Sequence, residues 1–311
     1  MTLHVFNPEH DIALAYDNKY FTAPHAGRQL RHDLDYLPVL WAEEGDFVLV
    51  ENVNSAQQHA LRLQRYGKQV QFVDRNDVER LSEQIDRVLP WGWDSSVKFQ
   101  LKQMGVNGSV LPDDEVLADI RKLSNRQFSS DVLKELQGCL NNPILLGKAF
   151  YVDNLSDLEN ILKEKGKVVI KAPWSSSGRG VRYIDTVLDA ALANWAKNVI
   201  KSQGGIMIEP YYNKVKDFGV EFYSDNEGVH YAGLSVFHTV NGAYIGNSLA
   251  DEEEKLSILS TYISNELLIK VISTLEQLLT VKLRGVYTGA LGVDMMIVAA
   301  GEAFMLHPVV E

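Results

Sequence analysis

A loop of serine and glycine lies between a lysine and an arginine in residues 168–184, VVIKAPWSSSGRGVRYI. Lys171 ends a β-branched run and Arg179 lies inside the loop, so both side chains could donate to anionic oxygens. Neither GxxxxGK[ST] nor GxGxxG is present, and VRYI after the loop has the pattern of a strand. The segment therefore predicts a flexible hairpin that covers phosphates. The small residues of this flap are Ser175, Ser176, Ser177, Gly178 and Gly180.

Length and composition exclude several classes of function. The chain has 311 residues, of which 46% are hydrophobic and 23% are charged, and this is enough for two domains. A formal net charge of −11 argues against nucleic acid as the main partner, because a phosphate backbone requires a basic face. No apolar run approaches the length of a membrane span, and a single cysteine, Cys139, excludes an internal disulfide. We expect a cytoplasmic protein that acts on small molecules, without a membrane partner; a homodimer is left open.

The first 95 residues alternate short apolar runs with helical patterns. LHVF at 3–6, FVLV at 47–50 and QVQFV at 69–73 have the pattern of strands, and a helical pattern lies between the second and third runs. Such alternation is typical of a parallel sheet. Residues 1–95 are therefore predicted to form a Rossmann-like α/β domain that ends near PWGWD.

The rest of the chain has a different organisation. Residues 96–140 have consecutive helical patterns and are predicted to form a helical linker region. Residues 141–208 contain helices, short strands and the flap, and they are predicted to form a small α+β lobe. Residues 209–311 are rich in strands, with a hairpin signal at 241–242 and a core-facing helix predicted over 252–280.

In their order and spacing, the charged residues after the first domain resemble the nucleotide site of the ATP-grasp superfamily. Arg126 stands where the family has a basic residue before the flap, Lys171 matches the flap lysine, and Glu209 matches the acid at the end of the hinge strand. Tyr211 follows two residues later, and Asp217 stands where the family has a ribose-binding acid. The resemblance implies a Rossmann-like pre-ATP-grasp domain followed by an ATP-grasp fold of two α+β lobes. It also implies that ATP is bound by these residues and by the flap.

Two acids near the end complete the resemblance. Asp294 in GALGVDMMIV and Glu311 in FMLHPVVE match the metal-binding acids of the family, and carboxylates suit Mg²⁺ or Mn²⁺. The resemblance implies an ATP-dependent ligase that joins a carboxylate to an amine or thiol through an acyl phosphate, with Lys171 and Arg179 as catalytic residues. One position departs from the family, because many such ligases have arginine two residues before the first metal acid and this chain has Gly292. A phosphotransferase and a non-catalytic nucleotide-binding regulator are the alternatives.

Several of these residues also have structural interpretations. Arg126 could be a surface residue paired with Asp131, and Glu209 and Asp217 could be ordinary charges at strand ends. His238 could reach a phosphate or form a local hydrogen bond.

The segment FNPEHDIALA, after the first predicted strand, also has two interpretations. Asn7 could cap a helix that begins at Pro8 and has acidic residues in its first turn. Alternatively, His10 and Asp11 face the acceptor substrate, because ligands of open α/β sheets collect at the carboxyl ends of strands.

The chain ends on the residue that matches the second metal acid. In the family an asparagine follows that acid two residues later and completes the metal shell. We therefore expect that the natural polypeptide continues beyond Glu311, and that the C-terminal lobe of this chain is truncated and poorly active.

Overall fold

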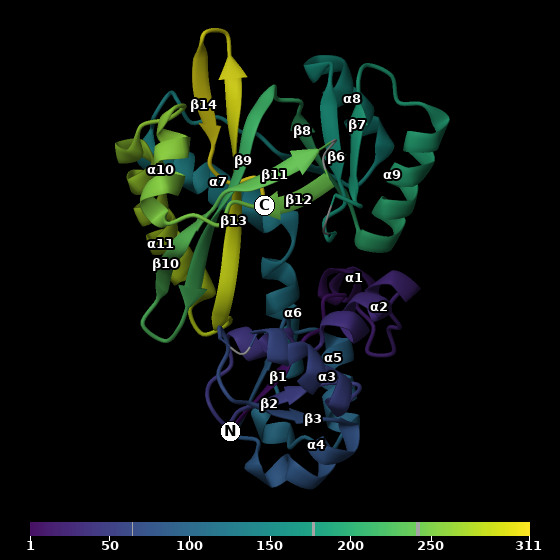
Figure 1. The fold of residues 1–311 in the computed structure, drawn as a ribbon. Coiled ribbons are helices and arrows are strands. Elements are labelled where there is room, and N and C mark those ends of the chain that lie inside the picture. Colours follow the sequence, from purple (N-terminus) through teal and green to yellow (C-terminus); the bar gives the residue numbers. More distant parts are fainter. Residues whose placement is uncertain (64, 176–177, 241–242) are drawn as a thin grey trace. The chain divides into compact units, whose positions relative to one another are not determined.

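The computed structural model describes residues 1–63, 65–175, 178–240 and 243–311 (Figure 1). The chain divides into two compact units, unit 1 (residues 1–122) and unit 2 (residues 123–311). The division falls inside the segment that the sequence predicts as a helical linker. Each helix of the described residues is too short or too polar to cross a membrane.

Unit 1 contains the parallel sheet that the sequence predicts. Its elements are β1 (Thr2–Val5), α1 (His10–Tyr16), α2 (His25–Leu34), η1 (Leu37–Leu40), β2 (Phe47–Leu49), α3 (Val53–Ala60), η2 (Leu61–Leu63), β3 (Gln71–Val73), α4 (Arg75–Leu81), η3 (Ser82–Gln84), β4 (Arg87–Pro90), α5 (Ser95–Gln103), η4 (Gly108–Val110) and α6 (Asp114–Leu123, whose last residue lies past the division). The strands are parallel, in the order β3-β2-β1-β4. Phe47 and Val48 are successive residues of β2 but belong to separate apolar clusters, so both faces of the sheet are covered.

The first sheet of unit 2 carries the flap. Its elements are α7 (Arg126–Leu140), β5 (Phe150–Val152), α8 (Leu155–Lys165), β6 (Val168–Lys171), β7 (Val181–Ile184), α9 (Ala190–Gln203) and β8 (Ile206–Pro210). The strands are antiparallel, in the order β5-β8-β6-β7. Ile170 and Ile208 lie opposite each other on the face that packs with Leu158 of α8 and Ala196 of α9. The other face presents the alternate residues, and these include the charged Lys171 and Glu209.

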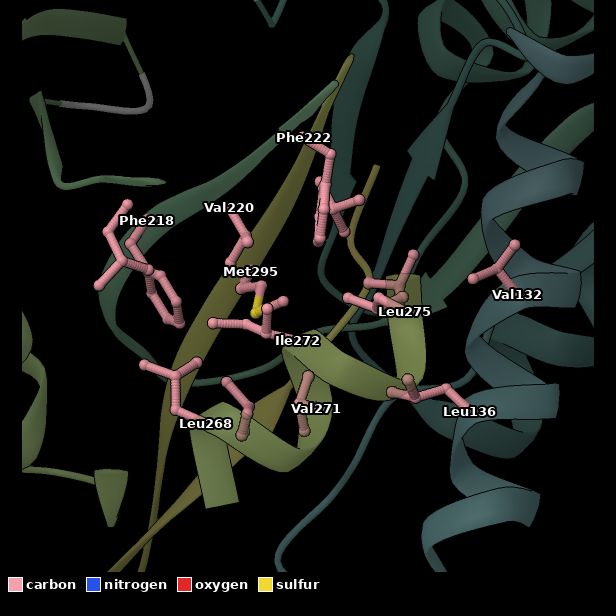
Figure 2. Close-up of a cluster of buried hydrophobic side chains, with 14 of the residues drawn as sticks. Val132, Leu136, Phe218, Val220, Phe222, Leu268, Val271, Ile272, Leu275 and Met295 are labelled. Carbon is pink, nitrogen blue, oxygen red and sulfur yellow. The ribbon is translucent and has the colours of Figure 1, made fainter. Parts of the chain in front are cut away.

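The second sheet of unit 2 is longer and also antiparallel. Its elements are β9 (Lys214–Ser224), β10 (Val229–Ser235), α10 (Glu252–Ser260), α11 (Asn265–Leu283), β13 (Gly289–Ala300) and β14 (Ala303–His307), with the separate ribbon β11 (Phe237–Val240) and β12 (Ala243–Asn247). The strand order is β10-β9-β13-β14. Figure 2 shows Phe218, Val220 and Met295 of this sheet packed with Leu275 of α11 and Leu136 of α7. One face of this sheet is therefore apolar and covered by helices.

The prediction of a single helix over 252–280 is wrong, because the segment forms two helices, α10 and α11. Ser264 accepts a hydrogen bond from the backbone N–H of Leu267 at 3.2 Å and begins the second helix. Leu259 of α10 and Leu268 of α11 both belong to the same apolar cluster. The helical spacing of apolar residues therefore continues from α10 into α11, so this pattern does not reveal the break between the two helices.

The packing of α11 predicts a large difference between two aliphatic residues of that helix. Leu275 is fully buried in the cluster of Figure 2, whereas Ile269 is 58% exposed. We expect Leu275→Ala to lower the free energy of unfolding by about 2–5 kcal/mol, because it leaves a cavity. The control Ile269→Ala should change it by less than about 0.5 kcal/mol. Equal effects in urea denaturation would contradict this account of the core.

Candidate functional site

The polar face of the second sheet brings together three carboxylates. In the register of β9 with β13, Asp294 lies opposite Gly219 and Gly292 lies opposite Glu221. Side chains alternate along a strand, so Asp217, Glu221 and Asp294 project from the face opposite Phe218 and Met295. The same alternation that builds the core therefore gathers these acids on one surface.

A buried ion pair lies on the polar face of the first sheet. Nζ of Lys171, at the end of β6, is 2.7 Å from Oε1 of Glu209 in β8, and the two residues are 7% exposed each. The register places Val169 opposite Glu209 and Lys171 opposite Met207, so the pair is diagonal across adjacent strands. Lysine has three donor hydrogens, and this pair uses one of them.

Arg126, the first residue of α7, joins the base of the flap to the C-terminal acid. It is 5% exposed, and its guanidinium donates to the carbonyl oxygen of Ala172, to Oγ and the carbonyl oxygen of Ser175, and to Oε2 of Glu311, at 2.6–2.8 Å. Its own backbone N–H donates to the carbonyl oxygen of Pro173. Arg126 is therefore not a surface partner of Asp131, and the fork of the guanidinium fixes the loop after β6 against the end of the chain.

Asp294 and Glu311 lie on neighbouring backbone segments. The N–H of Asp294 donates to the carbonyl oxygen of Glu311 at 2.9 Å, and the N–H of Val310 donates to that of Asp294 at 2.8 Å. Loss of hydration, followed by repulsion from Glu311, Glu221 and Asp217, raises the pKa of Asp294 to about 7, and Lys171 opposes the rise. Asp294 is nevertheless exposed on the sheet face, so we attribute more weight to the repulsion than to burial.

These two acids fit a hard divalent cation in part. In the described part of the chain, no group of three or more histidine, cysteine or acidic residues has the geometry to hold a metal by itself. Mg²⁺ normally uses one or two carboxylates together with phosphate oxygens and water. Asp294 and Glu311 supply two such carboxylates, and the excess of negative charge around Asp294 favours a cation.

Asp217 and Glu221 are held by different neighbours. Asp217 forms an ion pair with Lys214 and accepts a hydrogen bond from Oγ1 of Thr239 at 3.2 Å. The carboxylate of Glu221 lies close to Gly292. A Cβ atom at that position would be 2.8 Å from Oε2 of Glu221. Burial raises the pKa of Glu221, and a hydrogen bond with Ser235 opposes the rise. Sequence reasoning missed Glu221, although its spacing of four residues from Asp217 in a strand was a signal for the same face.

His307 is a second residue that sequence reasoning missed. It is 1% exposed at the end of β14, and neither ring nitrogen has a hydrogen-bond partner among the described residues. The ring packs edge to face with Tyr212 at 5.7 Å, and it contacts Gly147, which has φ +124°. Burial, and then the charge of Lys171, lower the pKa of His307 to about 3. The histidine is therefore neutral at ordinary pH.

The remaining described residues of the flap and of the hinge after β8 differ in exposure. Arg179 and Gly178 are exposed, and Gly180 is buried against Ser175. Tyr211 is 43% exposed, and Nζ of Lys167 lies 4.1 Å from the centre of its ring. Ser176 and Ser177, and the hairpin signal at 241–242, lie outside the described residues.

The segment after β1 does not have the predicted cap. The side-chain amide of Asn7 donates to the carbonyl oxygen of Gly92 at 2.8 Å and to Asp94, and α1 begins at His10 after Glu9. Nδ1 of His10 lies 3.1 Å from Asp94. Asn7 and His10 are thus tied to the loop after β4. Nε2 of His238, in β11, lies 3.1 Å from Oγ of Ser248. This contact agrees with the interpretation that His238 forms a local hydrogen bond.

The sequence of this protein matches no protein-family model and no curated protein. Solved structures do match. D-alanyl-alanine synthetase A from Vibrio cholerae aligns with a TM-score of 0.54 at 12% identity, over 99% of this chain and 86% of that one. An N5-carboxyaminoimidazole ribonucleotide synthetase in complex with ADP aligns with a TM-score of 0.50 at 15% identity, over 100% of this chain and 70% of that one. At this identity the likeness concerns the fold, and the ATP-grasp fold predicted from the sequence is confirmed.

The state of His307 predicts a specific acid sensitivity. Below pH 6.5 the unfolded chain binds a proton at this histidine, whereas the histidine of the folded chain stays unprotonated down to about pH 3. Stability is therefore lost as pH falls through that window. We expect the stability of His307→Leu relative to the parent to rise by up to about 1.4 kcal/mol per pH unit between pH 6 and pH 4.5.

The control for this measurement is His25→Leu, which replaces an exposed histidine at the start of α2. At each pH the effect of His25→Leu on the unfolding free energy is measured beside that of His307→Leu, to show what the same replacement does at an exposed position. A pH-independent difference between His307→Leu and the parent would show that His307 is not kept neutral by its surroundings.

Proposed function

We propose that the protein is an ATP-dependent ligase that joins a carboxylate to an amine or thiol through an acyl phosphate. The observation that supports this most is a buried cation, Lys171, whose charge acts on Asp294 within a cluster of carboxylates in unit 2. Mg-ATP carries both kinds of charge that such a site requires, because its phosphates bind cations and its metal binds carboxylates. The ATP-grasp fold, and the ADP bound to one solved protein of that fold, agree with a nucleotide here.

The nucleotide would lie along the polar faces of unit 2. Lys171 has two donor hydrogens beyond its bond to Glu209, and these would reach phosphate oxygens. Glu209 and the backbone that follows it would accept the exocyclic amine of adenine. Asp217, which already accepts from Thr239, would bind a ribose hydroxyl.

The flap and Arg126 would complete the phosphate site. Ser175, Ser176, Ser177, Gly178 and Gly180 would lay N–H groups and small side chains over the phosphates. Arg126 holds Ser175 and the base of this loop, so it would position the flap as well as contribute positive charge. Arg179 is exposed on the flap and would contact phosphate when the flap closes.

Asp294 and Glu311 would hold Mg²⁺, which, when bound, neutralises phosphate charge and orients the phosphoryl group for transfer. Their proximity to Glu221 and Asp217 leaves repulsion that a cation relieves. Arg126 already contacts Glu311, so one oxygen of that carboxylate is engaged by the protein.

The chain's own contribution to the reaction would be position and charge. Lys171 and Arg179 would stabilise the oxygens that become more negative as the γ-phosphoryl group moves from ATP to the substrate carboxylate. The amine or thiol then attacks the acyl phosphate, phosphate leaves, and an amide or thioester forms beside ADP. Closure of the flap would exclude water, which otherwise hydrolyses the acyl phosphate.

One observation favours a second candidate, a phosphotransferase that acts without an acyl phosphate. Ligases of this superfamily often have an arginine where this chain has Gly292, and a Cβ atom there would meet Glu221 at 2.8 Å. The site therefore has a carboxylate where the acyl-phosphate oxygens would need a cation.

ADP release separates these candidates. Ligation through an acyl phosphate requires that ADP release over many turnovers needs both a carboxylate and an amine or thiol added to Mg-ATP, because the carboxylate alone yields at most about one ADP per site and slow hydrolysis. ADP formed with a single alcohol or phosphate acceptor would favour the phosphotransferase. Binding of ATP without ADP release under any acceptor would contradict both and support a non-catalytic regulator.

The cations of the flap should control nucleotide affinity. We expect Lys171→Met and Arg179→Ala each to weaken ATP binding by about 10- to 100-fold, because each removes a charged donor to phosphate. Arg179 is exposed, so its variant should retain the parent's stability. Lys163→Ala, an exposed lysine of α8, is the control and should leave affinity unchanged. Unchanged affinity in both test variants, measured by calorimetry, would remove the flap from the site.

The ribose role of Asp217 is tested with a matched ligand. We expect the parent to bind ATP about 10-fold more tightly than 2′,3′-dideoxy-ATP, since the hydroxyl hydrogen bond to a carboxylate is charge-assisted. Asp217→Ala should bind both nucleotides equally. A variant that still prefers ATP to the dideoxy analogue would assign the ribose contact to another residue.

A further inference from the structure

Unit 1 contains a cavity of its own, of about 530 Å³, where three parallel strands end. Glu9 follows β1, Glu51 follows β2, and Asp74 follows β3, and all three line it. The volume lies within the range of small-molecule sites, and the carboxyl edge of a parallel sheet is where such sites form. We call this space the unit 1 cavity.

Most of the acids around the unit 1 cavity already have partners within the protein. Asp35 accepts the backbone N–H of Glu51 at 2.7 Å, and Glu51 pairs with His32 at 2.7 Å. Asp74 accepts the N–H groups of Asn76 and Asp77 as the cap of α4. These contacts stabilise the walls and engage one carboxylate oxygen of each acid.

Glu9 differs from these acids in the pairing of its two carboxylate oxygens. The residue is 9% exposed, and its Oε1 accepts a hydrogen bond from Nη1 of Arg31 at 2.9 Å. Its Oε2 is buried without any partner among the described residues. Glu9 therefore has acceptor capacity that no described group of the protein uses, and an unpaired buried carboxylate oxygen is costly.

Two arginines at the unit 1 cavity have guanidinium groups available to a ligand. Arg28 of α2 and Arg75 at the start of α4 are exposed, and neither forms an ion pair among the described residues. Arg31, by contrast, is engaged by Glu9 and by Oε1 of Gln100 at 3.4 Å. The described lining of the cavity therefore offers a buried acceptor together with forked donors for carboxylate or phosphate.

We propose that the unit 1 cavity binds a small molecule that carries an amine and an anionic group, the amine donating to Glu9 and the anion contacting Arg28 and Arg75. Phe21, Leu49 and Met104 supply apolar contact for the body of the ligand. An amino acid with a large apolar side chain, or an amino phosphate, has this combination of groups. The inference does not rest on ligase activity, because it concerns binding to unit 1.

Calorimetry on the full chain, without ATP, tests the proposal with matched probes. L-phenylalanine carries both groups, whereas phenethylamine lacks the carboxylate and 3-phenylpropionate lacks the amine. Phosphoethanolamine, with ethanolamine and ethyl phosphate as its controls, tests phosphate as the anion. We expect at least one of the two complete probes to bind about 10-fold more tightly than either of its partial analogues. The complete probe that binds identifies the anionic group.

Variants then assign the contacts. Glu9→Gln should weaken binding of the complete probe by about 10-fold, and the double variant R28A/R75A should do the same. Both arginines are exposed, so the double variant should keep the parent's thermal midpoint. Arg62→Ala, an exposed arginine outside the cavity, is the control and should bind as the parent does. Absence of binding by both complete probes at millimolar concentration, or equal binding by the amine-free analogues, would overturn the proposal.

Discussion

Repulsion among carboxylates on one sheet face is the constraint on which the site of unit 2 depends. Asp217, Glu221 and Asp294 lie on adjacent strands, and Glu311 joins them by backbone hydrogen bonds to Asp294. Loss of hydration, together with repulsion from these like charges, raises the pKa of Asp294 to about 7. Such a cluster costs the folded protein stability, and a cation bound between the carboxylates would relieve the repulsion.

The buried cations of unit 2 complement that cluster. Arg126 bonds Glu311 and the loop after β6, and Lys171 bonds Glu209. Each is under a tenth exposed, and each lies at the end of an element of regular structure. Because a buried guanidinium or ammonium must be paired, these contacts also hold the base of the flap in place.

The residues that the sequence predicts for this site are those with a local chemical pattern or a match to the resembled family. The sequence indicates Lys171 because it borders a loop of glycine and serine, and Asp294 because it matches a metal-binding acid of the family that the chain resembles. Glu221 was missed, since its role depends on Gly292 of the neighbouring strand, 71 positions away, having no side chain. The parallel sheet of unit 1 followed from alternation alone, whereas the break at Ser264 is hidden by apolar spacing that continues across it.

Other features depend on contacts between distant segments. His307 is neutral because Gly147 and Tyr212 exclude water from its ring, and no pattern near residue 307 indicates them. The unpaired oxygen of Glu9 becomes visible only when Arg31 occupies the other oxygen. The neutral state of His307 and the unpaired oxygen of Glu9 depend on which neighbours the fold brings to each side chain. These neighbours are distant in the sequence, so the sequence alone does not predict them.

A crystal structure of the protein with Mg²⁺ and ADP tests the central account most directly. The account predicts the diphosphate beside Lys171 under the flap, the adenine beside Glu209, and the metal between Asp294, Glu311 and phosphate oxygens. A nucleotide bound away from these residues, or Mg²⁺ bound without Asp294, would contradict it.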